Sequence, residues 1–204
     1  MICHSGTSMV PVVDARMYHF AARGLYNGLV LLGDDETGSY WDHITGECVY
    51  GSSRGKRMEV RPVLHTNVKE ALKKWPDLSI ALSSFDNEWH RQAEEMAESK
   101  RTAQLPPEFP GTMGEEDDRL PRMTSGVGVV GNGACRFYPV ETLRQSGGVI
   151  RDELEGKMIT IRLTEEGFPM VESEQVETPL HLFTRWYGFS YTYPQCEVYR
   201  KIED

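Results

Sequence analysis

The sequence predicts an α+β protein built mainly from antiparallel β-strands, with a few short helices. Short apolar runs alternate with turn residues along most of the chain, and helical spacing of apolar residues is confined to a few segments. Of the 204 residues, 39% are hydrophobic, which is sufficient for a packed core. We expect two β-rich sections, residues 1–101 and 124–204, packed as one unit and joined by an acidic connection rich in proline and glycine at 102–123.

The N-terminal section begins with a series of short strands. Apolar runs bounded by turn residues predict strands at 9–13, 17–21, 29–32, 47–50 and 58–63. Asn27 and Gly28 indicate a tight turn, because both residues tolerate a positive φ at little cost. This part of the chain is therefore expected to be antiparallel β-structure.

Helical spacing appears first after residue 65. Thr66 is expected to cap a helix that Pro76 ends, because Val68, Leu72 and Trp75 recur at helical spacing between them. A short buried strand is expected at 78–82. The segment that follows Ser84, up to residue 101, has the pattern of an amphipathic helix.

The C-terminal section repeats the β-rich pattern. Strands at 127–130 and 134–138 flank Gly131-Asn132-Gly133 and predict a hairpin. A short helix is expected at 140–145, and a strand pair at 158–163 and 169–172. The aromatic tail is expected to form a helix from Pro179 to about Tyr187 and to close the core.

Composition narrows the class of protein. A net charge of -9 without a basic stretch argues against nucleic acid as a partner. No window approaches the apolar length of a membrane span, and the N-terminus has no export-signal pattern, so as written the chain is expected to be cytoplasmic. The four cysteines, Cys3, Cys48, Cys135 and Cys196, are scattered without a disulfide-scaffold density or a C-x-x-C spacing, and are expected to be thiols.

Several stretches together resemble one family. These are ICHSGTSMVPVVD, GLYNGLVLLGDDETGSYWDHITGECVYG, GVGVVGNGACRFYPVETL, GGVIRDELEGKMITI and FTRWYGFSYTYPQCEVY. Their order and spacing resemble the mostly bacterial domain-of-unknown-function family 3179, over most of the chain except 102–125. The resemblance implies no particular reaction.

The chain departs from the family pattern at its start. Relatives of this kind carry a C-x-x-C at the place of Cys3, so the pattern implies a cysteine directly before Met1. They also commonly have a further hairpin section and often an export signal ahead of this motif. We therefore expect either a shortened form or a true start upstream, and in the second case an extracytoplasmic location.

Cys3 and His4 are the first candidate for chemistry. Thiolate and imidazole are preferred ligands of zinc and copper, and a basic neighbour also helps a thiol to ionise and act as a nucleophile. Adjacent residues of an extended strand point to opposite faces, so one ion would need a backbone turn, for which Ser5-Gly6-Thr7 is suited. The alternative is a poorly ordered chain end.

Two further histidines are candidate ligands. His43 lies in the turn-rich stretch YWDHITGEC, where Trp41 and Asp42 are candidate binding residues; the alternative is a core aromatic followed by a hairpin turn. His65 follows a strand and precedes a helix, where it would face a cleft, unless the pair His65-Thr66 serves only to cap that helix.

Three more polar residues are candidate binding residues. Tyr26 and Asn27 can hydrogen-bond a ligand, although Asn27 also suits a turn. Arg185 can line a pocket or reach a carboxylate, although the aromatic tail around it also suits closure of the core.

The leading hypothesis is a thiol and imidazole site built by Cys3 and His4, with His43 and His65, that binds zinc or copper or carries thiol redox chemistry, with Cys3 as the catalytic group. The alternative is a non-catalytic domain that binds a small molecule or serves as a scaffold. There is no glycine-rich nucleotide loop, G-x-S-x-G or H-E-x-x-H, so whether the chain is an enzyme stays open, as does its oligomeric state.

Overall fold

The computed structural model describes residues 3–81, 105–174 and 178–201. Within these ranges the strands form five small sheets, and every pairing is antiparallel except that of β10 with β15. The sheets are β1 (Thr7–Val10) with β8 (Glu59–Pro62); β2 (Val12–Val13) with β3 (Arg16–Met17); β4 (Phe20–Tyr26), β5 (Leu29–Asp34), β6 (Tyr40–Asp42) and β7 (Cys48–Tyr50); β14 (Leu180–Arg185), β9 (Ser125–Val130), β10 (Cys135–Pro139) and β15 (Glu197–Val198); and β11 (Val149–Leu154), β12 (Lys157–Leu163) and β13 (Pro169–Ser173).

The helices in the described ranges are short. They are α1 (Val68–Lys74), the 3-10 turn η1 (Pro110–Thr112), α3 (Val140–Gln145) and α4 (Trp186–Thr192). The predicted fold class, α+β with mainly antiparallel sheets, is confirmed. Among the residues described, no helix has the length and apolar character needed to cross a membrane.

The tight turn predicted at Asn27-Gly28 is confirmed, and both residues have the positive φ that the turn requires. Asn27 has φ 52° and Gly28 has φ 70°, and together they join β4 to β5. Two details differ: the cap of α1 and the strand expected at 78–82. The helix expected up to residue 101 lies outside the described residues.

The cap of α1 is Asn67, not Thr66. The side-chain oxygen of Asn67 accepts a hydrogen bond from the Glu70 backbone N–H at 2.9 Å, which satisfies one of the free donors at the helix start. The strand expected at 78–82 is wrong over the described part, 78–81. There the chain is irregular and Leu78 and Ile80 are each 44% exposed, because no neighbouring strand pairs with them.

In the C-terminal section the hairpin β9–β10, helix α3 and the pair β12–β13 confirm the prediction. β11, which pairs with β12, was not predicted. The helix expected from Pro179 to Tyr187 is wrong: residues 180–185 form strand β14, and the helix α4 starts only at Trp186. β14 pairs with β9 along its whole length, so ladder hydrogen bonds with β9 override the helical interpretation of this segment.

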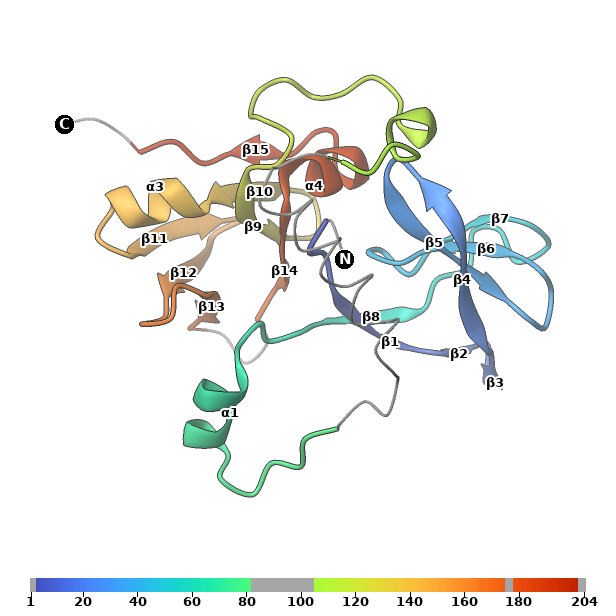
Figure 1. Ribbon diagram of the computed structural model, residues 1–204, viewed down its shortest axis with the longest axis horizontal. Coiled ribbons are helices and arrows are strands. Elements are labelled where there is room, and N and C mark those ends of the chain that lie inside the picture. Colours follow the sequence, from blue (N-terminus) through green and yellow to red (C-terminus); the bar gives the residue numbers. More distant parts are fainter. Residues whose placement is uncertain (1–2, 82–104, 175–177, 202–204) are drawn as a thin grey trace.

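One hydrophobic cluster joins the two β-rich sections. Cys3, Leu29 and Ile44 from the first section pack with Trp186 and Phe189 from the second, all of them at most 4% exposed. In Figure 1 the strands β1 and β8 extend between the β4–β7 sheet and the part that contains β9, β14 and α4. The division into sections at 102–123 stays a prediction, but the core is shared.

Candidate thiol site

Cys3 lies four residues before β1 and is held by β14. The Arg185 backbone N–H donates to the Cys3 carbonyl oxygen at 2.8 Å, and the Thr184 hydroxyl lies 3.3 Å from the same oxygen. The Cys3 side chain is only 3% exposed. The chain is therefore docked into the core at Cys3.

His4 turns the chain directly after Cys3. Its φ of 58° lies in the left-handed region, which a residue with a Cβ adopts only at an energetic cost. The turn brings both the backbone N–H and the hydroxyl of Ser5 back to the Cys3 thiol. The predicted turn is present, and it occurs at His4 itself.

His43 reaches the same place from the turn that follows β6. The carboxylate of Asp42 shapes this turn by accepting hydrogen bonds from the backbone N–H groups of Ile44 (2.8 Å) and Thr45 (2.7 Å). Nδ1 of His43 donates to the Val30 carbonyl oxygen at 2.9 Å, which orients the ring. The other ring nitrogen, Nε2, is buried without an oxygen or nitrogen partner among the described residues, and the ring interacts with the Cys3 thiol.

The two side chains change each other's protonation. Burial opposes ionisation of Cys3 and is the largest single influence, but hydrogen bonds from His43 and Ser5 together with the charge of His43 outweigh it, so the pKa of Cys3 is lowered. For His43, burial likewise opposes the charged form, but the hydrogen bond and charge of Cys3 and the charge of Asp42 outweigh it, and its pKa is raised. Both changes favour a thiolate beside an imidazolium.

Ser5, Thr184 and Tyr187 also belong to this site. The sequence places Ser5 in the predicted turn after Cys3 but brings neither Thr184 nor Tyr187 to the thiol. The Ser5 and Thr184 hydroxyl oxygens are 2.6 Å apart and both residues are fully buried. The Tyr187 hydroxyl contacts Cys3, and burial, followed by the charge of Cys3, raises the pKa of Tyr187, so it remains a donor toward a thiolate. Ser5 lies two residues from Cys3, but nothing in the sequence pairs Cys3 with the aromatic tail.

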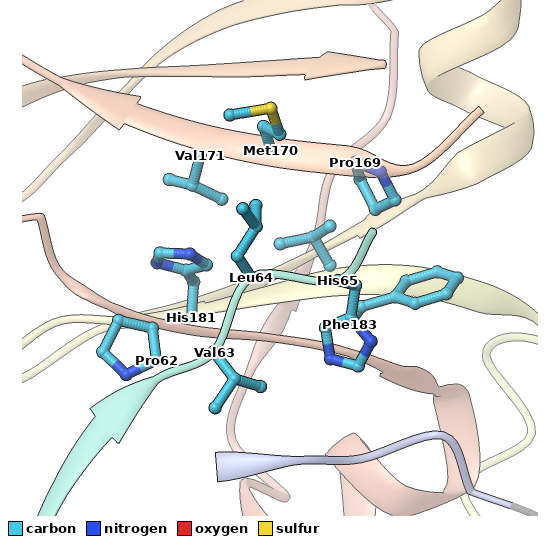
Figure 2. Close-up of a pocket in the computed structure, with 10 residues that line it drawn as sticks. Pro62, Val63, Leu64, His65, Pro169, Met170, Val171, His181 and Phe183 are labelled. Carbon is cyan, nitrogen blue, oxygen red and sulfur yellow. The ribbon is translucent and has the colours of Figure 1, made fainter. Parts of the chain in front are cut away.

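His4 and His65 do not complete a metal site with Cys3 and His43. The His4 ring packs against Phe183 with centroids 6.1 Å apart, and the His65 ring meets the same phenyl at 5.5 Å. Figure 2 shows His65 and Phe183 in a separate cavity, together with His181. In the described part of the chain, no group of three or more His, Cys, Asp or Glu side chains is placed to hold a metal ion.

The five residues predicted to bind a ligand all have definite positions in the fold. Trp41 is fully buried and its indole N–H donates to Asp34 at 2.7 Å, Asp42 shapes the turn that contains His43, and Asn27 forms the β4–β5 turn. Tyr26 is 59% exposed on β4, and the Arg185 guanidinium donates to the Met123 carbonyl oxygen at 2.9 Å. A binding role for them stays a prediction.

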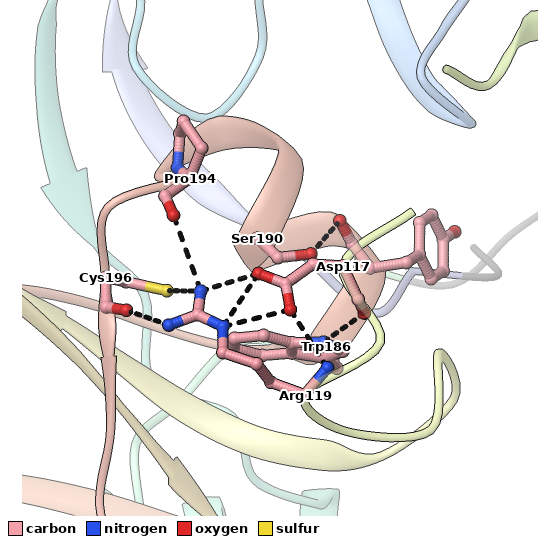
Figure 3. Close-up of polar contacts among 7 residues, drawn as sticks. Asp117, Arg119, Trp186, Ser190, Pro194 and Cys196 are labelled. Carbon is pink, nitrogen blue, oxygen red and sulfur yellow. Dashed lines mark hydrogen bonds and ion pairs between the residues drawn. The ribbon is translucent and has the colours of Figure 1, made fainter. Parts of the chain in front are cut away.

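A second polar cluster anchors the helix that carries Tyr187. Figure 3 shows the Arg119 guanidinium between the Asp117 carboxylate and the backbone of Cys196, whose carbonyl oxygen it meets at 2.7 Å. The same group lies over the Trp186 ring, 5.2 Å from its centroid. These contacts pin the connection around residue 119 to the first residue of α4, next to the thiol site.

Comparison with known proteins assigns the chain to a family. The family model described as "Protein of unknown function (DUF3179)" matches residues 1–191, so the chain belongs to this family. No curated protein and no solved structure matches it.

Proposed function

We propose that this protein carries out thiol redox chemistry, with the Cys3 thiolate as the reactive group and His43 as its proton partner. The difference between Cys3 and the other cysteines carries this proposal. The pKa of Cys48, Cys135 and Cys196 is raised, in each case first by burial, and that of Cys196 reaches about 11. Among the four cysteines of the chain, only Cys3 has a lowered pKa.

Burial restricts the reaction partner. With the thiol-bearing residue 3% exposed, a small and uncharged oxidant suits the site better than a protein disulfide. Hydrogen peroxide meets this requirement. The Cys3 thiolate attacks one peroxide oxygen, an S–O bond forms as the O–O bond breaks, and the leaving hydroxide takes a proton from the His43 imidazolium. The products are a sulfenic acid on Cys3, water and a neutral His43.

The metal-binding version of this hypothesis has less support. Cys3 and His43 supply two ligands, whereas a stable zinc site in proteins uses three or four protein ligands. His4 and His65, which would have completed the set, pack on Phe183. The remaining alternative is a scaffold domain in which Cys3 is an unreactive core residue.

Alkylation of the folded protein by iodoacetamide across a pH series tests the thiolate. Peptide mass spectrometry reads Cys3 separately from the other three cysteines, which serve as internal controls. We expect Cys3 to react at lower pH than the others, and His43→Gln to slow its alkylation at pH 7 about tenfold, because the imidazolium no longer favours the thiolate. His65→Gln is the matched control and should leave the Cys3 rate unchanged.

The redox step has its own measurement. The folded protein is treated briefly with hydrogen peroxide and then unfolded in the presence of a sulfenic-acid trap such as dimedone, which should label Cys3 in the wild type and label it much less in His43→Gln. A Cys3 pKa near the ordinary value of about 8.5 would contradict the proposal. So would a Cys3 that reacts only after unfolding, and either result would favour the scaffold domain.

A further inference from the structure

A cavity of about 210 Å³ lies on the opposite side of β14 from the thiol site. β14 provides Phe183 and His181 to this cavity, while the intervening Leu182 and the next residue, Thr184, face the shared core and Cys3. The segment that ends β8 and the strand β13 form its other walls. Its described lining includes His65, Val171, His181 and Phe183.

Among the described residues of this lining, two histidines are the polar side chains, and they lie on either side of Leu64 (Figure 2). Nδ1 of His181 donates to the Pro179 carbonyl oxygen at 2.9 Å, so in the neutral ring Nε2 carries a free lone pair. Burial lowers the pKa of both His65 and His181, and His181 further lowers that of His65. Both rings are therefore neutral near pH 7.

The second histidine of the lining, His65, has an unpaired ring nitrogen among the described residues. Its Nε2 is buried and has no hydrogen-bond partner among the described residues, while its ring packs edge-on against Phe183. This nitrogen lies beside Gly6, where an added Cβ would be 3.8 Å from it, so the acceptor considered for a ligand in the cavity is Nε2 of His181.

We propose that this cavity binds a small, uncharged and mainly apolar molecule whose single hydroxyl or N–H group donates a hydrogen bond to Nε2 of His181. The size fits, because a protein cavity of about 150 Å³ can hold benzene, and this one is somewhat larger. None of the described residues that line the cavity is charged, which disfavours an ion, because an ion would be buried without a partner among them. Neither property depends on Cys3.

Phenol and toluene test the proposal as a pair of equal size that differs in one hydrogen-bond donor. Binding to the folded wild-type chain is followed by chemical shifts of the histidine rings. Both compounds should bind saturably, and His181→Leu should weaken phenol about tenfold relative to toluene, because only phenol loses a hydrogen bond. Val171→Phe, which fills the cavity, should abolish binding of both.

The wild-type chain alone can overturn the proposal. Absence of saturable binding of phenol and toluene would do so, as would tighter binding of benzoate than of phenol, which would indicate an anion site. A phenol-to-toluene ratio that stays the same in His181→Leu would overturn the hydrogen bond to His181, and binding of both compounds to Val171→Phe would show that the cavity is not the site. Before binding is compared, circular dichroism must show that each variant has the secondary structure of the wild type.

Discussion

The cysteines show how neighbours set the chemistry of one side chain. Cys3 and Cys196 are both buried, and both have a cationic partner, His43 for the first and Arg119 for the second. At Cys196 the Arg119 Nη2 is 3.8 Å from the sulfur and already engages Asp117, so burial dominates and the pKa rises to about 11. At Cys3, His43 and Ser5 act together and burial is outweighed. Reactivity therefore depends on how many donors converge on the sulfur.

Gly128 is required by close packing. A Cβ added there would lie 2.0 Å from Cε2 of Phe189 and 2.3 Å from Cδ2, and both belong to a ring that is fully buried in the shared core. We expect Gly128→Ala to destabilise the protein by about 1–3 kcal/mol, because Phe189 must move. Urea unfolding measures the effect.

Gly24 is the matched control for this substitution. It also lies within a strand, β4, but a Cβ there would meet nothing within 4 Å. Gly24→Ala should leave stability within about 0.5 kcal/mol of the wild type. Equal effects of the two variants would contradict the packing argument.

Helix α4 illustrates an element whose start is set by distant parts of the chain. Its N-cap, Arg185, makes no side-chain capping bond. Instead the backbone N–H groups of Trp186 and Tyr187 donate to the carbonyl oxygens of Thr124 and Arg122, at 2.8 and 3.1 Å. These acceptors belong to the connection before β9, so the change from β14 to α4 depends on where that connection runs.

Helix α1, by contrast, has a local cap that a substitution can test. Asn67→Ala should destabilise the protein by about 1 kcal/mol, because the Glu70 backbone N–H loses its acceptor. Thr66→Ala should change stability much less, since Thr66 is exposed and lies outside the cap. Urea unfolding of both variants decides between the two adjacent residues, and a larger effect at Thr66 would contradict the assignment of Asn67.

The pH dependence of the protein's folding stability should reflect the ionisation of Asp34. This side chain is 3% exposed; burial alone would raise its pKa, but hydrogen bonds from the Trp41 indole and from Thr37 outweigh burial and lower it. A carboxyl whose pKa is lower in the folded than in the unfolded state stabilises the protein above about pH 4, and this stabilisation is lost as the pH falls through the folded-state pKa.

We therefore expect Asp34→Asn to be destabilised by about 1–3 kcal/mol at pH 7, with the difference from wild type shrinking at pH 3 and below. Urea unfolding at both pH values provides the measurement. Asp35→Asn is the control, because Asp35 is exposed and pairs with Arg23 at the surface, where an ion pair contributes little to stability. A wild-type–variant difference that is constant with pH would contradict the role of Asp34.

Local features of the structure were predictable because their causes are local. The left-handed backbone at Asn27-Gly28, the hairpin around Gly131-Asn132-Gly133 and the short helix α3 each follow from residues within a few positions. The predicted secondary structure is wrong where pairing with a strand that is distant in the sequence determines it. Residues 180–185 pair with β9, whose partner residues lie 50 to 60 positions earlier in the chain, and the apolar residues at 78–81 pair with no strand in the described part of the chain.

The candidate site likewise has features that depend on the local sequence and features that depend on the tertiary structure. The sequence by itself determined the class of fold, the family resemblance and the reactive types of side chain, since these depend on residue identity and short-range spacing. Only the tertiary structure decided that Cys3 meets His43, forty residues away, while His4 and His65 pack on Phe183. The physical reason is that a thiol's pKa depends on burial and on donors within contact distance, and long-range packing supplies both.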